Sequence, residues 1–93
     1  MATLESKICV PKDVLFRDLE DEAVILNLET GRYYGLDGVG VRMWSLLAQH
    51  GQVEQAYRTL LDEYEISEEQ LLKDLLRLVD ELASQGLVQV DAG

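Results

Sequence analysis

The sequence predicts one α+β domain, in which a three-stranded antiparallel sheet is followed by three helices. A chain of 93 residues is too short to build two hydrophobic cores. Apolar residues form short strand-like runs as far as residue 36, and from residue 39 they recur at helical spacing. We expect residues 14–90 to form the domain. Residues 1–13 show no sustained period, and we expect them to form a loosely held N-terminal arm, with Ile8 and Val10 tucked onto the domain.

The strands are expected at residues 14–19, 23–28 and 32–36. Glu20-Asp21 is the expected first turn, and Glu29-Thr30-Gly31 is the second, with Gly31 in a left-handed conformation. Strands joined by two such short turns pair in simple meander order. The first and third strands are therefore the edges of the sheet.

Helical spacing begins after Asp37, the expected N-cap of a first helix that Gly51 ends. A second helix is expected at 53–64. Ser67 starts the third, because Ser67 and Gln70 have the spacing of a capping box. This helix ends before Gly86, and the residues after it are expected to return to the core as a short strand or extended tail. The order of elements resembles a winged helix-turn-helix with its sheet first.

The charge of the chain disfavours two classes of partner. Eighteen acidic residues against eight basic ones leave a formal net charge of −10. Nucleic-acid binding requires clustered lysine and arginine, as does adhesion to anionic membranes. The chain has no apolar run long enough to span a bilayer and no secretory signal at its N-terminus, so we expect a cytoplasmic protein.

Residues for catalysis or metal binding are scarce. The sequence has one histidine, His50, and one cysteine, Cys9. His50 suits a helix C-terminus, where a positive ring complements the dipole, and Cys9 has no nearby base in the sequence. We expect no catalytic residue, no metal site and no cofactor, and so a protein that is not an enzyme.

The third helix has more apolar surface than one core contact needs. One stripe consists of Leu71, Leu75, Leu78 and Leu82, and a second of Leu72, Leu76, Val79 and Ala83. Together they cover an arc of about 160°, wider than the roughly 100° stripe of an ordinary surface helix. Either the helix is buried on two sides, or the second stripe lines a groove.

The third strand is the other feature with a functional implication. Residues 32–36 form a short aromatic edge with one charge at its start. Such an edge offers free N–H and C=O groups to an incoming strand, and Gly35 leaves room for a second backbone. The alternative is that Tyr33 and Tyr34 are ordinary strand residues.

Residues 26–36 (LNLETGRYYGL) and 37–44 (DGVGVRMW) resemble the PqqD-like proteins, which are peptide-recognition elements of ribosomal-peptide pathways. The family pattern is a TG-x-Y-x-x-L run followed by a helix that carries a tryptophan. Residues 74–87 match the family's third helix. The resemblance extends over about residues 14–90 and excludes the N-terminal arm.

The resemblance implies a non-catalytic protein that binds the leader of a precursor peptide. The leader would add as a strand to the third strand, in a groove beside the third helix. A separate leader peptidase, cyclase or radical modifying enzyme would then act on it. On this reading the peptide-binding residues are Arg32, Tyr33, Tyr34, Gly35 and Leu36 on the strand, with Leu72, Lys73, Leu76 and Asp80 on the helix.

Several functions remain open from the sequence. Lasso-peptide biosynthesis is favoured by the Arg-Tyr-Tyr strand, and pyrroloquinoline-quinone (PQQ) biosynthesis is the alternative pathway. A winged-helix DNA-binding regulator is disfavoured, because the third helix carries Lys73 and Arg77 among five acids. A dimerisation module would use the same open edge as a leader peptide.

Overall fold

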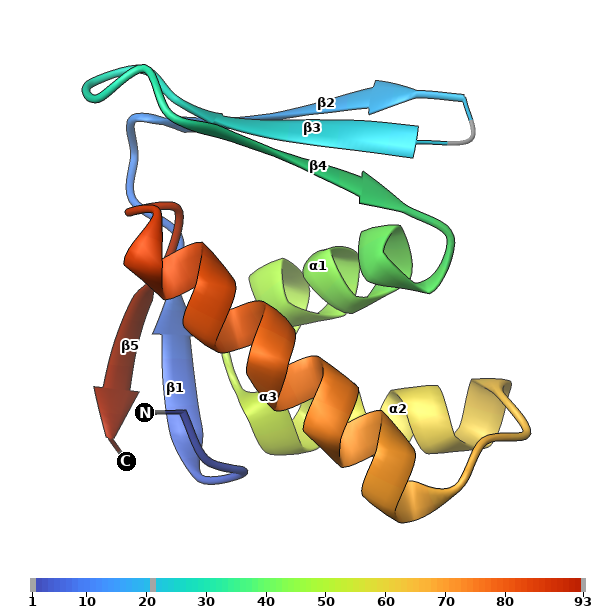
Figure 1. Ribbon diagram of the computed structural model, residues 1–93. Helices are drawn as coiled ribbons and strands as arrows, with labels where there is room; N and C mark the ends of the chain where they lie inside the picture. The colour runs from blue at the N-terminus through green and yellow to red at the C-terminus, as the bar shows by residue number, and fades with distance from the viewer. Residues whose placement is uncertain (1, 21, 93) are drawn as a thin grey trace.

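The three-stranded antiparallel sheet predicted from the sequence is present in a computed structural model, which describes residues 2–20 and 22–92. Its strands are hydrogen-bonded in the order β2-β3-β4 (Figure 1). They are β2 (Val14–Leu19), β3 (Glu22–Asn27) and β4 (Tyr33–Asp37). The fold is therefore α+β, and the meander leaves β2 and β4 as its edges.

The second turn of the sheet has the predicted glycine geometry. Gly31 has a φ of 77°, a left-handed conformation that glycine adopts without a steric penalty. The turn expected at Glu20-Asp21 lies partly outside the described residues, because Asp21 is not among them. Glu20 itself has a φ of 60°.

Three helices follow the sheet: α1 (Val39–His50), α2 (Val53–Glu63) and α3 (Glu68–Ser84). The prediction that Asp37 caps α1 is wrong. Asp37 is the last residue of β4, and the helix follows Gly38, which has a φ of 50° and makes no side-chain cap hydrogen bond. Gly51 ends α1 as predicted, with a φ of 68° and its N–H donating to the Leu47 carbonyl.

Helix α3 begins where the capping box predicts. The Ser67 hydroxyl accepts a hydrogen bond from the Gln70 N–H at 3.2 Å, and Gly86, beyond the other end, has a φ of 73°. The first apolar stripe is confirmed as the core face, because all four of its leucines are buried; they are Leu71, Leu75, Leu78 and Leu82.

The N-terminal residues are held more firmly than the sequence predicts. Strand β1 (Ser6–Cys9) pairs antiparallel with β5 (Gln89–Ala92), and Ile8 lies opposite Val90. The Ile8 side chain is buried in the core. The expected contact of Ile8 with the domain is therefore present, but the expectation of a loosely held arm is wrong for the paired residues of β1. Its partner is at the other end of the chain, and a four-residue strand is too short to show a period in the sequence.

Helix α1 covers one face of the three-stranded sheet, and among the residues that the structure describes no helix covers the other face (Figure 1). Ala23, Ile25 and Leu36 are buried between the sheet and the helices. Trp44 of α1 is also buried, and its ring stacks on Phe16 of β2 with centroids 6.1 Å apart. The packing of α1 on this face fixes which side chains of β4 point toward the helices.

Asn27 links the sheet to the end of α3. Its buried side chain accepts hydrogen bonds from the N–H groups of Glu29 and Thr30, and its Nδ2 donates to the Gly86 carbonyl at 2.8 Å. A buried amide with all these partners is a strong positional constraint. It holds the start of β4 close to the C-terminal end of α3.

No helix within residues 2–20 and 22–92 has the length and the apolar character needed to cross a membrane.

Candidate functional site

The free edge of β4 presents backbone groups from alternate residues. The Asn27 N–H donates to the Arg32 carbonyl at 2.8 Å, and the register places Ile25 opposite Tyr34. In an antiparallel pair, every second residue directs its N–H and C=O toward its neighbour. Tyr34 and Leu36 are thus directed toward β3. The groups that face away come from Tyr33, Gly35 and Asp37.

The side chains of β4 alternate between the two faces of the sheet. Leu36 is buried and Tyr34 is partly buried toward the helices, whereas Tyr33 is 71% exposed on the opposite face. A Cβ at Gly35 would meet no atom within 4 Å. A hollow of about 340 Å³ lies here, lined by residues of β3 and β4: Glu22, Ala23, Val24, Gly35, Leu36 and Asp37.

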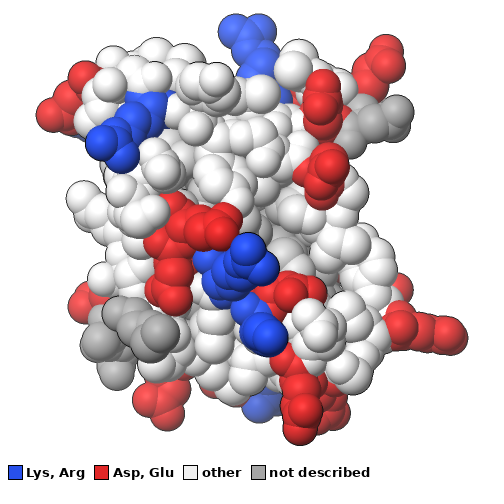
Figure 2. All heavy atoms as spheres, in the orientation of Figure 1, with Lys and Arg blue, Asp and Glu red and all other residues white. Residues whose placement is uncertain are grey.

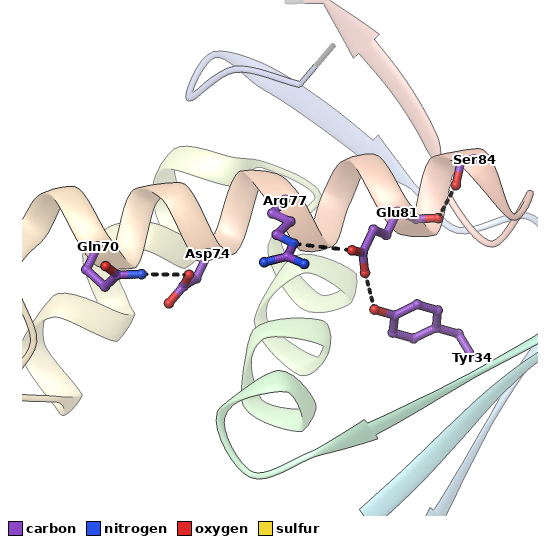
Figure 3. Close-up of polar contacts among 6 residues, drawn as sticks. All are labelled: Tyr34, Gln70, Asp74, Arg77, Glu81 and Ser84. Carbon is purple, nitrogen blue, oxygen red and sulfur yellow. Dashed lines mark hydrogen bonds and ion pairs between the residues drawn. The ribbon is translucent and has the colours of Figure 1, made fainter.

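Two side-chain bridges connect β4 to α3. The Tyr34 hydroxyl donates a hydrogen bond to the Glu81 carboxylate, as Figure 3 shows. Arg32, just before the strand, donates from Nη1 to Gln85 Oε1 at 3.2 Å. The flank of α3 that contains Glu81, together with Gln85 just beyond the end of the helix, therefore faces β4. A strand added to the edge of β4 would lie against these bridging side chains.

The helix residues predicted to contact a peptide lie elsewhere. On a helical wheel, Leu72 and Leu76 are about 140–180° from Glu81, and Leu76 packs against the core. The Asp80 carboxylate accepts a hydrogen bond from the Ala2 N–H at 2.8 Å, so it faces the N-terminal segment. Lys73 is exposed. The structure thus brings the five predicted residues of the strand together, but it does not bring these four helix residues to them.

Val79, in the second apolar stripe, is fully buried. Of the two interpretations of that stripe, burial of the helix on two sides is correct at this position. The second stripe packs on the opposite side of the core face from β4, so the extra apolar surface of α3 does not indicate a groove beside β4.

Sequence reasoning missed the polar flank of α3 that does face β4. Arg77 Nε lies 3.4 Å from Glu81 Oε1, and Gln70 Nε2 donates to Asp74 Oδ1 at 2.9 Å (Figure 3). Both pairs are four residues apart, the spacing at which helix side chains meet. That spacing is visible in the sequence, but it does not reveal which flank lies next to the strand.

The Tyr34 phenol remains protonated at neutral pH and can therefore donate a hydrogen bond. Its hydrogen bond to Glu81, its partial burial and the negative charge of Glu81 all raise the pKa of Tyr34, and the positive charge of Arg77 opposes them. Each of the first three effects disfavours the phenolate. Tyr34 therefore stays neutral and holds the Glu81 carboxylate in place.

Charges of both signs gather near the middle of the face in Figure 2, and α3 itself carries Arg77 paired with Glu81. Within residues 2–20 and 22–92, no group of three or more histidine, cysteine or acidic side chains is arranged to hold a metal. Cys9 is a free, exposed thiol. The groups at the β4 edge and on the α3 flank can form hydrogen bonds, ion pairs and apolar contacts with a ligand.

Comparison with known proteins identifies the family and a similar structure. The sequence profile of the family described as "Coenzyme PQQ synthesis protein D (PqqD)" matches residues 22–88. No curated protein sequence matches the chain. The solved structure "TbiB1 in Complex with the TbiA(beta) Leader Peptide" is similar, with a TM-score of 0.80 and 33% sequence identity. That similarity covers 87% of this chain and 94% of the TbiB1 chain.

The family match includes β3, β4 and all three helices, and so it includes the β4 edge and the α3 flank that form the candidate site. The fold, the matched segment and the similarity to TbiB1 agree, so this chain belongs to the PqqD family.

Proposed function

We propose that this protein binds the leader region of a ribosomally made precursor peptide and presents it to a separate modifying enzyme or leader peptidase. The observation that carries the proposal is the similarity over nearly the whole TbiB1 chain, whose structure is a complex with a leader peptide. The Arg-Tyr-Tyr strand leads us to favour lasso-peptide biosynthesis over PQQ biosynthesis as the pathway. The protein has no catalytic role in this proposal.

The leader adds as a strand to the free edge of β4. The outward N–H and C=O groups of Tyr33, Gly35 and Asp37 would pair with its backbone, since these residues form the non-hydrogen-bonded pairs with β3. Strand addition of this kind obtains affinity from the main chain and specificity from pockets for alternate side chains.

Backbone pairing alone gives little affinity. Each hydrogen bond contributes about 0.5–1.5 kcal/mol net, and ordering a flexible peptide offsets much of that gain. Micromolar binding corresponds to about −8 kcal/mol, so an apolar anchor is needed. The hollow beside Gly35 and Leu36 is our candidate for that anchor's pocket.

A DNA-binding function receives no support from α3. Its two basic residues, Lys73 and Arg77, are outnumbered by acids, and Arg77 is paired with Glu81. Duplex binding depends on releasing counterions from several phosphates, which this helix surface cannot do.

The test is a calorimetric titration with a synthetic peptide: the leader half of the precursor encoded beside the gene for this chain. We expect a dissociation constant near or below about 1 μM, unchanged when a chelator is added, because no metal takes part. A peptide of the same composition in scrambled order is the control. Binding no tighter than that of the scrambled peptide would contradict the proposed function.

A further inference from the structure

The Glu81 carboxylate is held at the boundary between two elements. One oxygen accepts from the Tyr34 hydroxyl of β4, and the other lies 3.4 Å from Arg77 Nε on α3 itself (Figure 3). The backbone carbonyl of Glu81 also accepts from the Ser84 hydroxyl at 2.7 Å. Glu81 is thus positioned from two sides, and its side chain is 42% exposed.

The two partners of this carboxylate differ in how firmly they are held. Tyr34 is partly buried on the inner face of the sheet, whereas the Arg77 side chain is 76% exposed and meets Glu81 at a long distance. Exposed ion pairs four residues apart contribute only about 0.3–0.5 kcal/mol. Arg77 can therefore be exchanged for another cation at low cost while Tyr34 stays in place.

Glu81 also has acceptor capacity to spare. A carboxylate offers about four lone-pair sites, and two contacts to its oxygens are present here. A lysine or arginine side chain can therefore bind without breaking the hydrogen bond from Tyr34. Cation–carboxylate hydrogen bonds are about twice as strong as neutral ones.

An added strand brings side chains to this carboxylate. Alternate side chains of a strand project to the same face at intervals of about 6.6–6.8 Å. On β4, the inner face carries Tyr34 and Leu36. A peptide strand paired with the free edge of β4 would place its own inward side chains beside these two residues. One of them would lie next to Tyr34 and hence within reach of Glu81.

The charge of the whole protein favours a cation at this position. The chain carries a formal net charge of −10, so basic peptides are attracted and acidic ones repelled.

We propose that Glu81 is a specificity-determining residue that accepts a lysine or arginine side chain of the bound peptide, and that Tyr34 positions its carboxylate. This inference rests on the proposed function and adds to it the chemical character of one leader residue. Glu81 contacts the ligand, whereas Tyr34 acts through Glu81.

The experiment compares Glu81→Gln with the parent protein in titrations of the same synthetic leader. Glutamine keeps a carbonyl that can accept from the Tyr34 hydroxyl, but it removes the charge. Glu69→Gln is the matched control, because it removes an equal charge from an exposed residue on another side of α3. We expect Glu81→Gln to weaken binding at least about tenfold and Glu69→Gln to change it by less than about twofold.

A second series of peptides identifies the partner of Glu81. Each lysine and arginine of the leader is replaced in turn by glutamine. One of these substituted peptides should bind to the parent and to Glu81→Gln with equal affinity, because it lacks the cation that pairs with Glu81. Tyr34→Phe should weaken binding of the original leader more than binding of that peptide, a difference that a purely structural role would not produce.

The outcomes separate this inference from the proposed function. If the leader binds the parent but no lysine or arginine is coupled to Glu81, the cation site is wrong and leader binding stands. The same conclusion follows if Glu69→Gln weakens binding as much as Glu81→Gln does. If the leader does not bind the parent, the proposed function fails and the cation site fails with it.

Discussion

Replacing Trp44 by alanine is expected to lower the free energy of unfolding by about 3–5 kcal/mol, the range for deletion of a large buried aromatic side chain. Trp44 is 4% exposed and stacks on Phe16 with an interplanar angle of 18°. It lies between α1 and the inner face of the sheet, so its removal leaves a cavity at the contact of these two layers. Small domains have about 5–15 kcal/mol of total stability, and this change removes a large part of it.

Urea unfolding followed by circular dichroism measures this loss. Tyr33→Ala is the control, since it also replaces an aromatic residue of the sheet region, but one that is 71% exposed; its effect should stay within about 0.5 kcal/mol. If Trp44→Ala unfolds like the parent but no longer binds the leader, Trp44 belongs to the binding site. Its assignment to the core would then be wrong.

Replacing Gly35 by proline is expected to weaken leader binding at least about tenfold, or 1.4 kcal/mol. The N–H of Gly35 faces away from β3, so proline removes a donor that only an added strand would use. Its ring would also stand where the backbone of the leader approaches. Proline is compatible with edge strands when the missing N–H faces solvent, and the domain should therefore remain folded.

Gly35→Ala is the matched variant for the proline change. It keeps the N–H, and its Cβ would meet nothing within 4 Å. We expect Gly35→Ala to weaken leader binding less than Gly35→Pro does, because the N–H that pairs with the leader is kept. Thermal melting checks that both variants fold. A folded Gly35→Pro protein that binds the leader as tightly as the parent does would exclude pairing at this residue.

The elements of the domain were predictable because their signals are local. The glycine at position 31, the capping box at Ser67 and the leucine stripe of α3 each lie within a short segment, and the structure confirms all three. The N-cap of α1 was not predictable in the same way. Asp37 has a suitable side chain, but it is the last residue of β4.

Long-range pairing was beyond the reach of the sequence. Strand β1 forms with β5 at the opposite end of the chain, and neither is long enough to show a hydrophobic period. The β1–β5 pair is nevertheless part of the packing around α3, because Ile8 is buried in the same core as Leu82.

The candidate site was predictable on the strand but not on the helix. The aromatic, nearly uncharged edge at residues 32–36 is evident in the sequence. A helical wheel shows two flanks beside the core leucines, but it does not tell which one faces β4. That depends on how α3 crosses the sheet. The hydrogen bond from Tyr34 to Glu81 shows that the polar flank of α3 faces β4. Leu72 and Leu76 are on the other side of the helix, where Leu76 packs against the core.

Amide hydrogen exchange tests strand addition to β4 most directly. In the free protein, the amides of Tyr34 and Leu36 should exchange slowly because they are directed toward β3, and those of Tyr33, Gly35 and Asp37 should exchange fast. On addition of the synthetic leader, we expect the amides of Tyr33, Gly35 and Asp37 to become protected. If these three amides still exchange fast with the leader bound, and protection appears on the N-terminal strand instead, the peptide does not add to β4.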